Sequence, residues 1–184
     1  MIGHGPIRSY VMGMDRCQGK EEASDSEIEE MARITKEAIE AGALGFSTSR
    51  TYLHRDKFGE YVPGTEATAK EMRTIANTIA DLGKGTLEIV SDWMDQDIEL
   101  DWVKEFVEKS DRTLTYAQTG GNPVETWKYC EENFPKGVKI RPQFPGRPTG
   151  MLFSLESTVH PFIAHPSLSL IHISEPTRLR LSRM

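Results

Sequence analysis

Apolar residues in the segment 25–41 recur every three or four positions, which is the spacing of an amphipathic helix. Ser24 and Glu27 have the spacing of a capping box at its start, and Gly42 follows its last periodic residue. The next run, 43–48, is apolar or small throughout, as expected for a strand buried on both faces. The pattern therefore predicts a helix that leads into a strand of parallel type.

The same helix-then-strand unit recurs along the chain, which favours an α/β fold with a parallel sheet. A closed (β/α)8 barrel and an open doubly wound sheet both fit this alternation. The loop-like start GHGPIR and the long loop after 43–48 favour a partial (β/α)8 TIM barrel of about four βα units within residues 1–166. The further elements are predicted as helices over 68–82, 97–110 and 123–134 and strands over 86–91, 113–119 and 138–144.

The last stretch, residues 167–184, has neither helical nor strand periodicity, and its charge is basic where the rest of the chain is acidic. The string LSLIHISEPTR within it resembles the translation of a sequencing adapter. We therefore expect residues 167–184 to be a non-native tail; an ordinary basic tail is the alternative.

The charge balance excludes some classes of partner. The chain has 22 Lys and Arg against 28 Asp and Glu, a net charge of −6, without a basic run interleaved with aromatic residues, so we expect no nucleic-acid partner. An apolar run long enough to span a bilayer and a signal-peptide layout are both absent from the sequence, so we expect a cytoplasmic protein without a membrane partner. Cys17 and Cys130 are far apart and lack metal-ligand spacing, which predicts reduced thiols.

A polar cluster follows the predicted strand 43–48 and is the most informative site signal. Hydroxyl groups together with an Arg suit a carboxylate, because the guanidinium of Arg50 can bind both carboxylate oxygens at once. Alternatively, the hydroxyls bind loop amides and Arg50 pairs with Asp56 or Glu60. The candidate substrate-binding residues are Ser47, Ser49, Arg50 and His54.

Two further residues are candidates for catalysis. His4 lies between two glycines and could move a proton or bind a ligand, or it could simply hydrogen-bond its own loop. Asp92 follows the strand 86–91, where a barrel places a base or ligand. A helix N-cap is the competing explanation, and Asp95 and Asp97 would cap equally well. The ends of the strands 113–119 and 138–144 carry Gln118, Arg141 and Gln143 in places comparable to that of Asp92. His160 and His165 are five positions apart, which is not the i, i+4 spacing of a zinc-binding pair.

Several blocks together resemble a known family. GHGPIRSYVMG, GALGFSTSRTYLHR, VPGTEAT and RPTGMLFSLESTVHPFIAHPS resemble consecutive blocks of the N-acyl-D-amino-acid deacylase (D-aminoacylase) type of the amidohydrolase superfamily, over about residues 2–166. The resemblance implies a zinc-dependent (β/α)8 barrel in which a metal-activated water hydrolyses an amide C–N bond of a small N-acyl amino acid. It also implies that this chain is an internal slice of such a barrel.

The resemblance assigns neither zinc ligands nor the main catalytic groups within this chain. The family's paired histidines, bridging cysteine and late aspartate would lie outside the slice, and 86–91 and 113–119 carry no histidine where two metal ligands are expected. We therefore expect this fragment alone to be inactive. Two alternatives stay open, namely a metal-free barrel that binds a small carboxylate and a truncated fragment without function. The oligomeric state is not indicated.

Overall fold

Five parallel strands and the helices between them make up the described fold, in a computed structural model. The structure describes residues 1–18, 21–92, 96–118, 123–144, 146 and 152, and all the elements belong to the unit Met1–Pro148. The strands are β1 (Ile2–Gly3), β2 (Gly45–Arg50), β3 (Thr86–Ser91), β4 (Leu114–Ala117) and β5 (Ile140–Gln143). The helices are α1 (His4–Met12), α2 (Met14–Cys17), α3 (Asp25–Glu40), α4 (Ala69–Leu82), α5 (Gln96–Lys109) and α6 (Pro123–Asn133).

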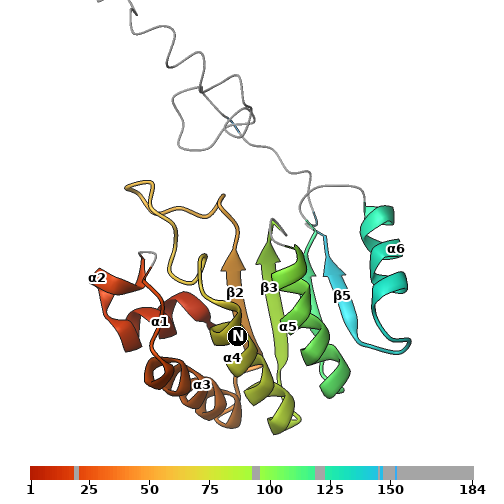
Figure 1. Ribbon diagram of the computed structural model, residues 1–184, viewed down its shortest axis with the longest axis horizontal. Helices are drawn as coiled ribbons and strands as arrows, with labels where there is room; N and C mark the ends of the chain where they lie inside the picture. Colours follow the sequence, from red (N-terminus) through yellow and green to blue (C-terminus); the bar gives the residue numbers. More distant parts are fainter. Residues whose placement is uncertain (19–20, 93–95, 119–122, 145, 147–151, 153–184) are drawn as a thin grey trace, which may run out of the picture. The chain divides into compact units, whose positions relative to one another are not determined.

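The strands lie side by side in the order of the chain, β1-β2-β3-β4-β5, and every pair is parallel. Because such crossovers are right-handed, a sequential order places the connecting helices on one face of the sheet. Helix α4 packs between α3 and α5, and Figure 1 shows α4 and α5 in front of the strands. The predicted α/β fold with its parallel sheet is confirmed, and these strands lack the reversal of order that an open doubly wound sheet requires.

The expectation of a loop at the start of the chain is wrong. The segment GHGPIR instead ends a short strand, β1, and begins a helix, α1. Gly3 pairs with Ser47 of β2, and Pro6 lies in the first helical turn, where its missing N–H leaves no hydrogen bond unmade. A strand of two residues is too short to show a periodicity, so only the pairing with β2 reveals it.

The predicted capping box is confirmed in full at α3, whereas only one of its two hydrogen bonds forms at α4. At α3, Ser24 and Glu27 form the full capping box, and the Ser24 N–H donates to Glu27 at 2.8 Å. At α4, the Thr68 hydroxyl accepts from the Glu71 N–H at 3.2 Å, but the Glu71 side chain turns into the protein interior. A buried network described below holds that carboxylate, so it does not return to the helix start.

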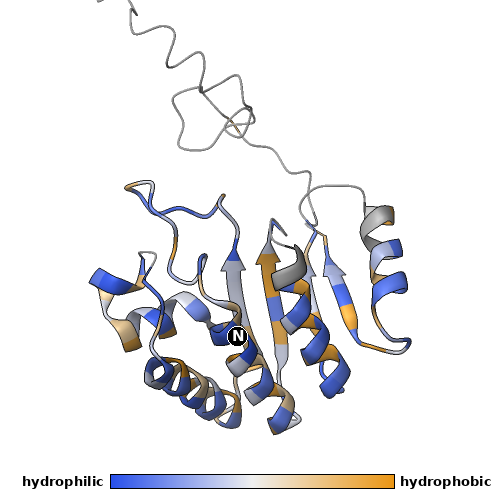
Figure 2. Ribbon diagram, viewed as in Figure 1, coloured by the Kyte–Doolittle hydropathy of each residue, from blue (hydrophilic) through white to orange (hydrophobic). Residues whose placement is uncertain are grey.

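The helix-facing side of the sheet carries the apolar core. Leu87 and Ile89 of β3 are completely buried there, and Trp102 and Phe106 of α5 are equally buried. Figure 2 shows β3 as mostly hydrophobic with one hydrophilic band. Glu88, between Leu87 and Ile89 in the sequence, faces the other side of the sheet. The other fully buried aliphatic and aromatic residues of β2 and α4 are Phe46, Met72, Ile75 and Ile79.

The strands approach each other most closely at Gly45, where β2 begins. A Cβ atom at this position would lie 2.0 Å from the Thr86 carbonyl oxygen, and the φ angle of Gly45 is +153°. Only glycine avoids this clash with the backbone of β3.

None of the described helices is both long and apolar enough to cross a membrane.

Ile89→Ala should lower the free energy of unfolding by about 2–5 kcal/mol, because it leaves a cavity under α4 and α5. Val90→Ala, one residue further along β3 and half-buried on the opposite face, should cost about half as much or less. Urea unfolding of both variants measures the difference. Equal losses would contradict the assignment of the core to the helix-facing side.

Candidate functional site

A polar row crosses the face of the sheet that the helices leave open. Ser47 pairs with Glu88, Glu88 with Thr115, and Thr115 with Arg141, so these four side chains point to the same side. Ser49 lies on that face as well, two residues nearer the carboxyl end of β2. An open face lined by hydroxyls and charges differs sharply from the apolar helix-facing side.

A cavity of about 560 Å³ lies over this face beside β1, β2 and β3. The loop that follows β2 closes one side of it. Polar groups that face it can therefore meet a small molecule. Its lining includes His4, Ser47, Ser49, Pro63, Glu88 and Val90.

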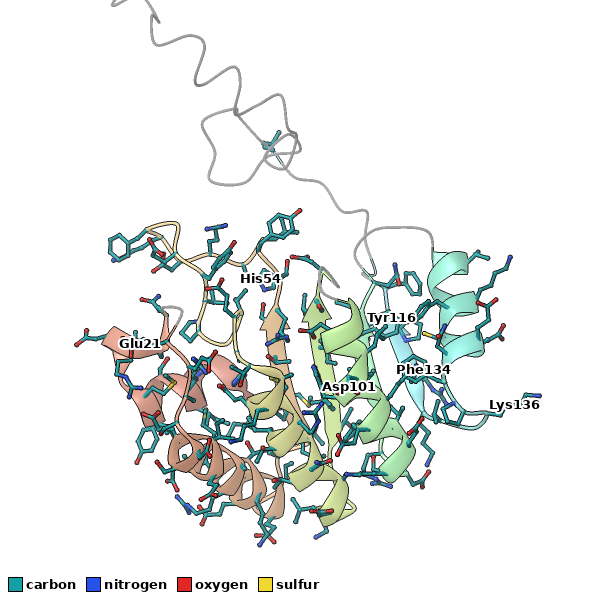
Figure 3. The ribbon with its side chains drawn as sticks, in the orientation of Figure 1. Glu21, His54, Asp101, Tyr116, Phe134 and Lys136 are labelled. Atoms are coloured by element: carbon teal, nitrogen blue, oxygen red, sulfur yellow. The ribbon has the colours of Figure 1, made fainter. Side chains whose placement is uncertain are left out.

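The sequence-predicted residues Ser49 and His54 lie together at the mouth of this site. The Ser49 hydroxyl oxygen and Nδ1 of His54 are hydrogen-bonded at 2.6 Å, and the hydroxyl is the donor in the tautomer that carries its ring proton on Nε2. Figure 3 shows His54 above the carboxyl end of β2. Asp92, at the end of β3, accepts hydrogen bonds at 2.7 Å from both the Thr51 hydroxyl and the Tyr52 N–H. Asp92 thus fixes the turn that presents His54.

Arg50 lies on the opposite side of the strand from Ser47 and Ser49. Its guanidinium forms an ion pair with Glu99 of α5 and donates to the Ala67 carbonyl at 2.8 Å. The Arg50 and Glu99 side chains are only 10% and 7% exposed. Because side chains alternate along a strand, the structure separates Arg50 from the two hydroxyls with which the sequence grouped it.

Asp56, which the sequence offered as a partner of Arg50, is occupied within its own loop. Its carboxylate accepts from the N–H groups of Phe58 at 2.8 Å and Glu60 at 3.0 Å. Burial by itself raises the pKa of Asp56, but these backbone donors outweigh it and the pKa is lowered. The Gln18 side-chain amide also donates to this carboxylate at 3.0 Å and contributes to the lowered pKa, so Asp56 links its loop to the end of α2.

His4 is the centre of a buried polar network that joins α1, β2 and α4. Nε2 of His4 donates to Glu71 at 2.6 Å, and Nδ1 accepts from the Thr48 hydroxyl at 2.9 Å. Glu71 is completely buried and also pairs with Arg8. Gly64, with a φ angle of +97°, packs against the ring, and a Cβ atom there would lie 2.6 Å from Nδ1. The histidine is held in one orientation on every side.

Burial decides the charge of this network. It lowers the pKa of His4, and this exceeds the opposing effect of the hydrogen bond to Glu71. For Glu71 burial acts to raise the pKa, but the hydrogen bonds from His4 and Arg8 outweigh it and lower the pKa. The structure thus favours a neutral imidazole beside a carboxylate whose charge Arg8 balances. Sequence spacing could not find Glu71, which lies 67 residues from His4 on another helix. Arg8 lies one helical turn after His4 in α1, but this spacing carried no signal while GHGPIR was expected to be a loop.

The other predicted positions lie away from the His4 network and the Ser49–His54 pair, or lie outside the described residues. The Gln118 N–H donates to the Gln143 carbonyl at 2.9 Å, and Arg141 donates to the Ile140 carbonyl at 3.0 Å. His160, His165 and the predicted tail 167–184 lie outside the described residues. Among the residues that the structure describes, no three His, Cys, Asp or Glu side chains are grouped so that they could share a metal ion.

Comparisons with known proteins find partial relatives. The chain is 30% identical over 89 residues to the uncharacterized protein Rv2913c of Mycobacterium tuberculosis and to the uncharacterized protein Mb2937c of Mycobacterium bovis. The matched part is 46% of this chain and 15% of each relative, so the chain covers only a small part of their length. No family model matches the chain, and no solved structure matches it.

His4→Gln should flatten the pH dependence of stability between pH 7.5 and 5. The pKa of His4 lies below its ordinary value of about 6.5, so as pH falls through that value the unfolded chain binds a proton that the folded chain resists, and stability falls. Glutamine keeps a hydrogen-bonding side chain but does not titrate. Identical slopes for wild type and His4→Gln in urea unfolding would contradict the prediction.

Arg50→Gln should lower the free energy of unfolding by about 3–5 kcal/mol, because it removes the cation that balances the buried Glu99. Arg33→Gln, which breaks exposed ion pairs with Glu30 and Glu37, should cost less than about 1 kcal/mol. Thermal or urea unfolding of both variants tests this. Unchanged stability together with weaker binding of a carboxylate ligand would instead support the carboxylate-binding role expected from the sequence.

Proposed function

We propose that this chain is a slice of a (β/α)8 barrel of the amidohydrolase type, and that it supplies part of the substrate site for hydrolysis of an amide C–N bond. One observation supports this most: the parallel strands follow each other in chain order with their helices on one face. That is the winding of a barrel wall, in which the opposite face becomes the interior and the loops after the strands carry the chemistry. The polar row and the cavity of about 560 Å³ lie on that opposite face.

The open face suits a small N-acyl amino acid. The hydroxyls of Ser47 and Ser49 can donate to a carboxylate or to an acyl oxygen. Glu88, next to Ser47 in the sheet, can accept from an amide N–H. In this proposal His54 closes the mouth of the site and Arg50 acts only indirectly, by holding β2 against α5.

The described residues do not fit the zinc site that the resemblance implies. His4 has both ring nitrogens committed to Thr48 and Glu71, and His54 lies at the mouth bonded to Ser49. Val90 and Ala117 occupy the open-face positions near the carboxyl ends of β3 and β4, and neither can bind a metal ion. We therefore derive no step through zinc and assign this chain a part in substrate binding, without hydrolysis of the amide bond on its own.

A second candidate function is a metal-free barrel that binds a small carboxylate. The apolar residues Val90 and Ala117 at those two strand ends favour it. Assaying a longer protein that contains this sequence with an N-acyl amino acid would distinguish the two candidates, because only the hydrolase would release the free amino acid.

The 184-residue chain should bind N-acetyl-D-leucine in a saturable way without hydrolysing it. Ser47→Ala should weaken binding about fivefold, which corresponds to one hydrogen bond of about 1 kcal/mol. Isothermal titration calorimetry measures the affinity, and release of free D-leucine with added zinc measures turnover.

Ser26→Ala, an exposed serine in the first turn of α3, is the matched control and should bind as the wild type does. Unsaturable binding, or equal affinities of the Ser47→Ala and Ser26→Ala variants, would refute the proposed site. Zinc-dependent release of D-leucine by the chain itself would refute the assignment that it binds the amide without hydrolysing it.

A further inference from the structure

We propose that Ser49 and His54 form a metal-independent acyl-transfer pair that accepts small acyl esters, with Ser49 as the nucleophile and His54 as its general base. The hydroxyl oxygen and Nδ1 are 2.6 Å apart, within the range in which a base can take the proton of an attacking hydroxyl. This inference goes beyond the proposed amide hydrolysis and does not depend on it.

Accessibility distinguishes this pair from another hydroxyl–imidazole pair in the described part of the chain, Thr48 and His4. Both residues border the cavity, but Thr48 is only 4% exposed and His4 only 1% exposed, so almost none of their surface is open to an ester. Both ring nitrogens of His4 are also engaged. Ser49 is only half-buried and lines the cavity, and His54 is exposed.

The loop that carries His54 is held in place from two sides. Asp92 binds the first turn of the loop through the Thr51 hydroxyl and the Tyr52 N–H. Further along, Arg55 and Tyr61 form an antiparallel bridge, and the Arg55 guanidinium lies 4.1 Å from the centre of the Tyr61 ring. A base that is already in position does not have to be ordered during the reaction, which lowers the barrier.

The reaction balances without a metal or redox partner. Oγ of Ser49 forms a bond to the ester carbonyl carbon while Nδ1 of His54 takes the hydroxyl proton. The bond from the carbonyl carbon to the leaving oxygen then breaks, and His54 returns the proton to that oxygen, which leaves as an alcohol. The water oxygen next bonds to the carbonyl carbon of acyl-Ser49 as His54 takes its proton. The bond from that carbon to Oγ then breaks, His54 returns the proton to Oγ, and the carboxylic acid leaves. The sum is ester plus water giving acid plus alcohol.

The test uses the 184-residue chain with p-nitrophenyl acetate in the presence of EDTA. Release of p-nitrophenol should begin with a burst close to one equivalent of protein, and peptide mass spectrometry should find the acetyl group on Ser49. Phenylmethylsulfonyl fluoride, which forms a stable sulfonyl ester and releases fluoride, should label the same residue. It detects the nucleophile even if the acetyl group is lost rapidly.

Ser49→Ala should abolish both adducts, and His54→Gln should slow acylation by about 100-fold or more while the hydroxyl remains. Ser91→Ala is the matched control, because Ser91 is a serine at the same sheet edge on the helix-facing side, and it should react as the wild type does. Circular dichroism confirms that each variant is folded. Acetyl groups on lysines only, or unchanged rates in Ser49→Ala or His54→Gln, would overturn the proposal, whatever the outcome with N-acetyl-D-leucine.

Discussion

The alternation of side chains along parallel strands is the constraint on which the site depends. Each residue of a strand faces the side opposite its neighbours, and paired residues of adjacent strands face the same side. Since the helices cover one side only, Phe46, Leu87 and Ile89 meet the helices while Ser47 and Glu88 face away from them. One backbone geometry thus produces a core and a polar face from the same few residues.

The buried network around His4 ties the start of the chain to this sheet. β1 has only two residues and contributes little pairing of its own. His4, immediately after it, reaches Thr48 on β2 and Glu71 on α4, and Arg8 one turn later completes the charge balance. A buried carboxylate is stable only when such partners pair with it. Because His4 and Thr48 also line the cavity, the contacts that hold α1 in place fix that part of the cavity wall as well.

Two carboxylates stabilise different groups at the carboxyl end of β2. Glu99 holds Arg50 on the helix side, and Asp92 holds the turn that carries His54. The pair of Ser49 and His54 is left at the mouth between them, accessible and preorganised. Arg50, expected to recognise an anion, is therefore paired with Glu99 of α5, whereas Ser49 and His54, expected to line a pocket, are hydrogen-bonded to each other.

The sequence by itself determined the helices, most of the strands and their parallel alternation, because periodicity, capping residues and glycine stops are local signals that short segments carry. It also located Ser49 and His54, which lie only five residues apart. Only the tertiary structure decided which groups meet across long separations. The pairs His4–Glu71 and Arg50–Glu99, and the turn held by Asp92, arise when strands align in register and helices pack on one face, and no local pattern encodes that alignment.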